Sequence, residues 1–231
     1  MTDDPKKAAW SRETLEEAFR PYLELERDTS PQGRKKLRIL RAATQLFETQ
    51  GYRKTSVDEI ARKAEVAKGT VYLYYENKAK LLVDAIARQK LVLWSKLQPI
   101  FTGEVPEHER LHRYVQIMLT SARDVPLAAR LLRGDGELEA VLDEIGGDGQ
   151  YEQNRARGAE WLTLLLEAGA PGRFTAEEKS ARAHALMTLG FVSAMLLEDR
   201  LRLGRPYEEL ASTLADVVVY GAVNRPPESE G

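Results

Sequence analysis

Cysteine is absent from the 231 residues of this chain, and histidine occurs only three times. The absence of cysteine excludes disulfide bonds, thiol catalysis and cysteine-ligated zinc, so metal binding would depend on histidine, aspartate and glutamate. No apolar run approaches the roughly 20 residues that cross a bilayer, and the opening MTDDPKKAAW lacks the apolar core of a secretory signal. We therefore expect a cytoplasmic protein with no membrane partner and no cofactor.

Aromatic residues are also few, at 7%, but hydrophobic residues at 43% and charged residues at 30% are typical of a folded globular chain. Helix start and stop signals follow one another along the sequence, and convincing strand alternation is missing, which predicts an all-α fold class. We expect four segments. They are a partly helical N-terminal extension over 1–33, a small domain over 34–80, a larger helical domain over 81–225 and a flexible tail over 226–231.

Positive charge is concentrated in the small domain. Between Pro31 and Lys80 there are 12 Lys and Arg against 5 Asp and Glu, a net charge of +7, while the remaining residues carry 22 against 31, a net charge of −9. The chain average of −2 hides this separation. A basic segment on an acidic body suits local contact with a polyanion such as DNA, and the alternative is a solvated helix face.

Turn and capping residues divide the N-terminal part into an extension and a first helix. Ser11 is a candidate cap for a helix in the extension that Pro21 would limit. The sequence DTSPQG over 28–33 is typical of a linker. The next helix should begin near Arg34 and stop at Gly51.

Two short helices and one long helix are expected next. Ser56 and Glu59 have the spacing of a capping box, which predicts a helix of about two turns. A third short helix covers roughly 68–75, and Asn77 can cap a long fourth helix that should end before Pro99.

Proline and glycine divide the larger domain into five further helical stretches. The last two, over 175–203 and 206–224, are the most apolar, and each carries a stripe of apolar and small residues that is either internal core or a subunit interface. The stripe residues are Leu186, Gly190, Ala194, Leu197, Leu210, Leu214, Val217, Val218 and Gly221.

The two short helices, joined by residues 64–67, have the dimensions of a helix-turn-helix, whose second helix enters the major groove of DNA. That helix carries KGTVYLYY, and its i and i+4 residues Val71 and Tyr75 should face the core. Its other cationic, hydroxyl and tyrosine side chains should face solvent and DNA. These are Lys68, Thr70, Tyr72 and Tyr74.

The run ILRAATQLFETQGYRKTSVDEIARKAEVAKGTVYLYYENKAKLL, within residues 34–82, resembles the N-terminal domain of the tetracycline-repressor (TetR/AcrR) family of bacterial regulators. The resemblance implies a homodimer of nine-helix chains, whose last two long helices pair as a four-helix bundle and whose helices four to eight enclose an effector pocket. It places DNA contacts at Thr55, Ser56, Lys68, Gly69, Thr70, Tyr72, Tyr74 and Lys78. The chain departs from the family at Ala67, where many members have a capping serine, at a cost of roughly 1 kcal/mol.

The larger domain contains a set of residues that are candidates for an effector pocket, although residues of these types at helical spacing are more often plain core. They are His112, Gln116, Met118, Trp161, His184, Met187 and Phe191. The resulting hypothesis is a non-enzymatic, sequence-specific regulator of transcription. It would be a repressor that binds a palindromic operator in double-stranded DNA and is released by an unknown small-molecule effector.

Two alternatives remain open. The sequence HERLH matches the H-E-x-x-H pattern, in which His108 and His112 would bind zinc and Glu109 would act as the base of a hydrolase. No third histidine is nearby, since the only other one is His184. The second alternative is a helical adaptor for protein partners, which predicts weak DNA affinity that is insensitive to Lys68 and Tyr72.

Overall fold

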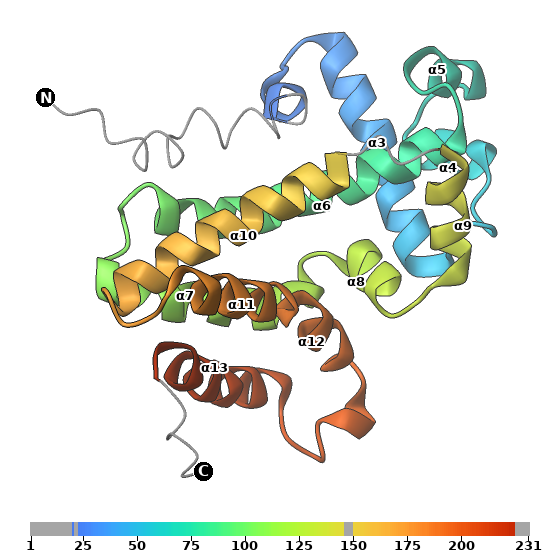
Figure 1. Ribbon diagram of the computed structural model, residues 1–231. Coiled ribbons are helices and arrows are strands. Elements are labelled where there is room, and N and C mark those ends of the chain that lie inside the picture. The colour runs from blue at the N-terminus through green and yellow to red at the C-terminus, as the bar shows by residue number, and fades with distance from the viewer. Residues whose placement is uncertain (1–19, 21–22, 146–149, 225–231) are drawn as a thin grey trace, which may run out of the picture. The chain divides into compact units, whose positions relative to one another are not determined.

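The computed structural model describes residue 20, residues 23–145 and residues 150–224, with side chains left out for 142–157. Every regular element in these ranges is a helix, which confirms the all-α fold class. The chain forms two compact units (Figure 1). We call them the head unit, with described residues up to Trp94 and again over 124–145, and the body unit, over 95–123 and 150–224. The helix expected after Ser11 and the expected tail over 226–231 lie outside the described residues.

The head unit is built around one hydrophobic core that contains Phe47 and Ile60. Its helices are α3 (Pro31–Gln50), α4 (Val57–Lys63), α5 (Lys68–Tyr74), the first part of α6 (Lys78–Phe101), α8 (Pro126–Leu132) and α9 (Gly136–Ile145). Leu127 of α8 and Leu138 of α9 are fully buried in that same core. The segment expected for DNA binding, 34–80, therefore lies within a larger unit that also needs α6, α8 and α9.

The N-terminal end of α3 differs from the expectation. The linker predicted over 28–33 is wrong in its second half, because the helix already begins at Pro31. Ser30 caps it by accepting a hydrogen bond from the Gly33 backbone N–H at 3.0 Å, and proline suits the first helical position because its missing N–H would have no helical partner there.

Part of the N-terminal extension belongs to the head unit. Residues 23–27 are helical, and Leu25 packs against the core. The Glu26 carboxylate accepts hydrogen bonds from Arg41 of α3 at 2.9 Å and from Arg88 of α6 at 2.7 Å. These two ion pairs hold the extension against both helices.

The fourth expected helix begins as predicted but runs further. Asn77 accepts a hydrogen bond from the Lys80 N–H at 2.7 Å, and α6 then continues through Pro99 to Phe101. The expected end before Pro99 is wrong because this proline lies in the last turn, where its ring costs a single backbone hydrogen bond. The Pro99 carbonyl accepts from Val105 at 3.2 Å just beyond the helix.

A buried glutamine joins three helices of the head unit. Gln89 of α6 is 4% exposed, and its amide donates to the Glu48 carboxylate of α3 at 2.5 Å. Its carbonyl oxygen accepts from the Leu127 N–H at the start of α8, at 3.0 Å. Burial raises the pKa of Glu48 above its usual value. Both polar ends of Gln89 are therefore satisfied inside the core.

The body unit packs α7 against α10 and α13, and α10 against α11 (Figure 1). Its elements are the end of α6, α7 (Glu107–Thr120), the 3-10 turn η1 (Ser121–Arg123), α10 (Gln150–Gly169), α11 (Ala176–Met187), α12 (Leu189–Met195), the 3-10 turn η2 (Asp199–Leu201) and α13 (Tyr207–Val223). None of the helices in the described ranges has the length and apolar character that a bilayer crossing requires.

The helix expected over 175–203 is instead broken into α11, α12 and η2. The first break is at Thr188, whose hydroxyl donates to the Ala185 carbonyl at 2.7 Å while its own N–H bonds the same carbonyl at 3.1 Å. This local bonding competes with the regular helical ladder. Beyond η2, Leu203 has φ of 49°, a left-handed conformation that ends the helical stretch.

A buried hydroxyl network ties α7, α12 and α13 together. The Ser193 hydroxyl accepts from the Ala122 N–H at 2.9 Å and lies 3.1 Å from the Tyr207 hydroxyl, which donates to the Leu119 carbonyl at 3.1 Å. Ser193 and Tyr207 are 0% and 2% exposed. Each of their hydroxyls is satisfied without water.

Candidate nucleic-acid interface

The turn between α4 and α5 sets the direction of the second short helix. The capping box predicted for α4 is confirmed, because Ser56 and Glu59 bond each other's backbone N–H groups at 3.2 and 2.8 Å. At the other end Glu65 has φ of 54°, and the chain turns back so that Val66 bonds the Ala61 carbonyl at 3.0 Å. Hydrogen bonding by Ser56 lowers the pKa of Glu59.

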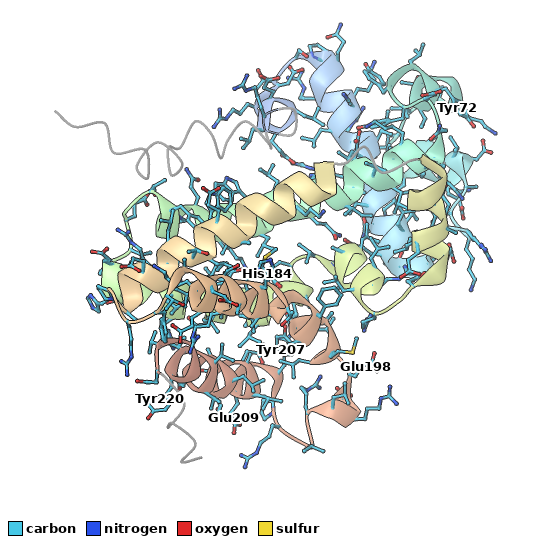
Figure 2. All side chains as sticks on the ribbon, in the orientation of Figure 1. Tyr72, His184, Glu198, Tyr207, Glu209 and Tyr220 are labelled. Atoms are coloured by element: carbon cyan, nitrogen blue, oxygen red, sulfur yellow. The ribbon has the colours of Figure 1, made fainter. Side chains whose placement is uncertain are left out.

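Helix α5 begins without a side-chain cap, as expected from Ala67. Its inner face is formed by Val71 and Tyr75, which are 1% and 2% exposed, and the Tyr75 hydroxyl donates to the Lys36 carbonyl at 3.3 Å. Tyr72 is 50% exposed and projects from α5 in Figure 2. The predicted division into a core face and an outer face is therefore confirmed for Val71, Tyr75 and Tyr72.

The other outer positions of α5 differ in exposure. Lys68 and Gly69 are exposed, while Thr70 and Tyr74 are half-buried. The Lys68 ammonium donates to the Asp58 carboxylate of α4 at 2.8 Å, and this hydrogen bond raises the pKa of Lys68. The ion pair is open to solvent on both sides, so its net contribution to stability is small.

Two residues of the expected DNA-facing set require correction, because their polar atoms point into the head unit. Thr55 is 1% exposed, and its hydroxyl donates to the Gly51 carbonyl at 2.7 Å. The Lys78 ammonium donates to the carbonyls of Tyr52 and Thr55 at 2.9 and 3.0 Å and lies 4.1 Å from the centre of the Tyr52 ring. Burial lowers the pKa of Lys78. Both side chains form hydrogen bonds to the loop before α4 and do not face outwards.

Comparison with known proteins identifies this arrangement. Residues 39–85, which cover most of α3, all of α4 and α5 and the start of α6, match the family model described as bacterial regulatory proteins, tetR family. This segment of the chain is a tetR-family domain. The match agrees with the helix-turn-helix geometry of α4 and α5.

Curated proteins similar to this chain are described as transcriptional regulators. The uncharacterized HTH-type transcriptional regulator YhgD of Bacillus subtilis is 31% identical over 105 residues, which are 46% of this chain and 54% of YhgD. The chain thus spans about half the length of the curated relatives it matches. A solved tetR-family regulatory protein from Rhodococcus RHA1 is 25% identical, with a TM-score of 0.60 over 86% of this chain and all of that one.

A second similar structure carries a ligand. The regulator FadR from Bacillus subtilis, solved in complex with stearoyl-CoA, has a TM-score of 0.56 over 80% of this chain and 98% of that chain. At 18% identity it shows a shared fold and nothing more.

The residues expected to line an effector pocket are all in the body unit but do not all point inward. His184 is exposed on α11, where its ring Nδ1 lies 2.8 Å from the Ser180 carbonyl, and Phe191 is 48% exposed on α12. These two are corrections, because they lie on outer helix faces. Trp161 is half-buried against the Phe101 ring, with centroids 5.3 Å apart. The other four are also half-buried: His112, Gln116, Met118 and Met187.

The residues expected at a dimer interface differ in burial from one helix to another. Leu186 and Ala194, at 3% and 0% exposure, belong to the internal core and are corrections. On α13 the internal core uses a different stripe, formed by Tyr207, Ala211, Ala215 and Ala222. The expected stripe on α13 remains open to varying degrees, from half-buried Leu210, Leu214 and Val218 to exposed Val217 and Gly221. Gly190 and Leu197 are half-buried.

The HERLH segment forms the start of α7. His108 is exposed, and His112 lies 3.0 Å from the Asp216 carboxylate of α13. Within the described ranges, no group of three or more histidine, aspartate or glutamate residues is arranged to hold a metal ion. His112 thus pairs with an acid of the neighbouring helix.

Proposed function

We propose that the chain is a sequence-specific transcriptional regulator that reads a palindromic operator in double-stranded DNA through α5. The observation that carries this proposal is the outer face of α5, where cationic Lys68 and phenolic Tyr72 stand exposed beside Gly69. Phosphate contacts commonly come from lysine, hydroxyl and tyrosine side chains, and the second short helix of a helix-turn-helix lies in the major groove. Ser56, Thr70 and Tyr74 complete the proposed contact surface.

A duplex selected by the full-length protein from a random pool tests this function. We expect an enriched palindrome with half-sites about one helical turn apart. Lys68→Ala should weaken binding to that duplex and reduce the salt slope of log K by about 0.9 for each phosphate that the lysine neutralises. Lys96→Ala, which removes an exposed cation from the body unit, is the matched control. Failure to enrich any sequence would overturn the proposal.

We also propose that two chains pair through α13. Val217 and Tyr220 are 63% and 73% exposed, and Figure 2 shows Tyr220 at the outer side of its helix. Apolar and aromatic side chains in this exposed position are typical of a subunit interface. Val217→Glu should give a monomer of unchanged helical content by sedimentation. A variant that remains dimeric would contradict pairing through this face.

The proposed regulator is a repressor that an effector releases, with Met118, Trp161 and Met187 as the apolar residues nearest to an effector. Stearoyl-CoA, the ligand of the FadR structure, is the first probe, and coenzyme A alone is its control. If the probe lowers operator affinity, linkage requires the operator to lower affinity for the probe by the same factor. Equal operator affinity with and without the probe would exclude stearoyl-CoA as the effector.

A further inference from the structure

Leu73 is outside the set of residues expected to face DNA, yet it is the most exposed large hydrophobic residue described in the head unit, at 82%. An α-helix turns by about 100° per residue, so Leu73 lies about 200° around α5 from buried Val71. It therefore points almost directly away from the core.

Gly69 lies on this outermost line as well, one helical turn before Leu73. A β-carbon added at Gly69 would have no atom within 4 Å apart from those of its chain neighbours and its own helix backbone, so packing against the rest of the chain does not require glycine here. Glycine in the middle of a helix is destabilising relative to alanine, and the cost is smaller for Gly69 in the first turn. The absence of a β-carbon at this position leaves room for close approach of another molecule to the helix.

The polar side chains of α5 flank this line. Lys68 and Tyr72 are one turn apart on one side, and Thr70 and Tyr74 are one turn apart on the other. When such a helix lies in the major groove, its flanks meet the phosphate walls and its outermost line meets the base edges. The side chain on that line with the greatest reach is Leu73.

An alkyl side chain can neither donate nor accept a hydrogen bond, which restricts what it can recognise in the groove. The apolar group that the major groove presents on a base edge is the C5-methyl of thymine. We propose that Leu73 determines sequence specificity by packing against a thymine methyl group in each half-site, with Gly69 allowing the helix to approach closely. This inference rests on the DNA-binding function proposed above.

The test removes the thymine methyl group and the Leu73 side chain separately. In the duplex selected by the full-length protein, thymine is replaced by deoxyuridine at one symmetric position at a time, and affinities are measured for the unaltered chain and for Leu73→Ala. Leu203→Ala, which truncates a leucine that is 90% exposed in the body unit, is the matched control.

We expect one thymine position at which deoxyuridine weakens binding of the unaltered chain by about fourfold per half-site, or about 15-fold for both, the size of one buried methyl group. Leu73→Ala should bind the thymine duplex weakly and lose its sensitivity to deoxyuridine at that position. The Leu203→Ala control should retain full sensitivity.

Three outcomes overturn the inference. If deoxyuridine changes the affinity at no position, the protein does not recognise a thymine methyl group. If Leu73→Ala is as sensitive to deoxyuridine as the unaltered chain, another residue contacts the methyl group. In both cases the enriched palindrome leaves the proposed function intact. If no duplex is enriched, the proposed function itself fails.

Discussion

Lys68 of α5 and Asp58 of α4 form an ion pair of 2.8 Å on the surface that we propose binds DNA. The carboxylate competes with phosphate for the lysine and also repels the DNA backbone. Asp58→Asn should therefore raise operator affinity by about three- to tenfold at low salt, with the gain shrinking as salt screens the charges. A gain no larger than that of Glu139→Gln, which removes an exposed acid from α9, would show that only net charge matters.

Gly69→Ala separates stability from binding. Because the new β-carbon would meet no atom within 4 Å outside its own helix backbone, the substitution should raise the free energy of unfolding through helix propensity, by less than the about 0.5–1 kcal/mol of a mid-helix position because Gly69 is in the first turn. Operator affinity should fall at the same time, since the methyl group would hold the helix away from the base edges. Denaturant titration and anisotropy on one preparation measure the two effects. Unchanged affinity would remove the argument for close approach.

Gln89→Met tests the buried connection between α3, α6 and α8. Methionine is similar in length but leaves the Leu127 N–H without its acceptor and Glu48 without its donor. The free energy of unfolding should fall by about 1–3 kcal/mol, the cost of leaving a buried polar group unsatisfied. Exposed Gln45→Met in the same unit is the control. Equal stability of the two variants would mean that these bonds contribute nothing net.

The capping box of α4 predicts an acid-sensitive contribution to stability. Hydrogen bonding by Ser56 lowers the pKa of Glu59 below its reference value of 4.5, so the stabilisation is fully present above that value and is lost as pH falls through the lowered pKa. The melting temperature of the unaltered chain should exceed that of Glu59→Gln at pH 7, and the difference should shrink towards pH 3. A difference that is independent of pH would contradict this mechanism.

In the body unit, Tyr207→Phe removes one hydroxyl from a buried network. The Leu119 carbonyl loses its donor and Ser193 loses a partner, so the free energy of unfolding should fall by about 1–2 kcal/mol. Tyr72→Phe, measured without DNA, is the control, because Tyr72 is 50% exposed and lies away from the proposed subunit interface. Figure 2 labels both tyrosines. Similar losses in the two variants would exclude a role for the network.

The helix-turn-helix could be predicted from sequence because its signals are local. The capping box, the uncapped start at Ala67 and the i, i+4 pair of Val71 and Tyr75 each depend on residues within one or two turns. The inward direction of Lys78 depends instead on the carbonyls of Tyr52 and Thr55, which the fold brings to it from more than 20 positions earlier. Nothing in the local pattern contains that information.

The predicted helix boundaries are wrong at residues whose effect on a helix depends on their position in it. Proline usually stops a helix, but Pro99 costs little in a last turn, and Pro31 starts a helix. Thr188 breaks the long helix through its hydroxyl although its neighbours are helical. Stripe residues such as Leu186 and Val217 look alike in sequence, and their different burial follows from which other helices pack beside them.

The burial of Leu127 and Leu138 in the core of the head unit has a consequence for biosynthesis. The chain leaves the ribosome from its N-terminus, so the helix-turn-helix is synthesised well before α8 and α9 emerge. Until residue 138 has been added, the nascent head lacks at least one of these two fully buried side chains. We therefore expect the surface that we propose binds DNA to reach its full stability only after more than half of the chain has been translated, and a fragment that ends at Trp94 to be less stable than the complete head unit.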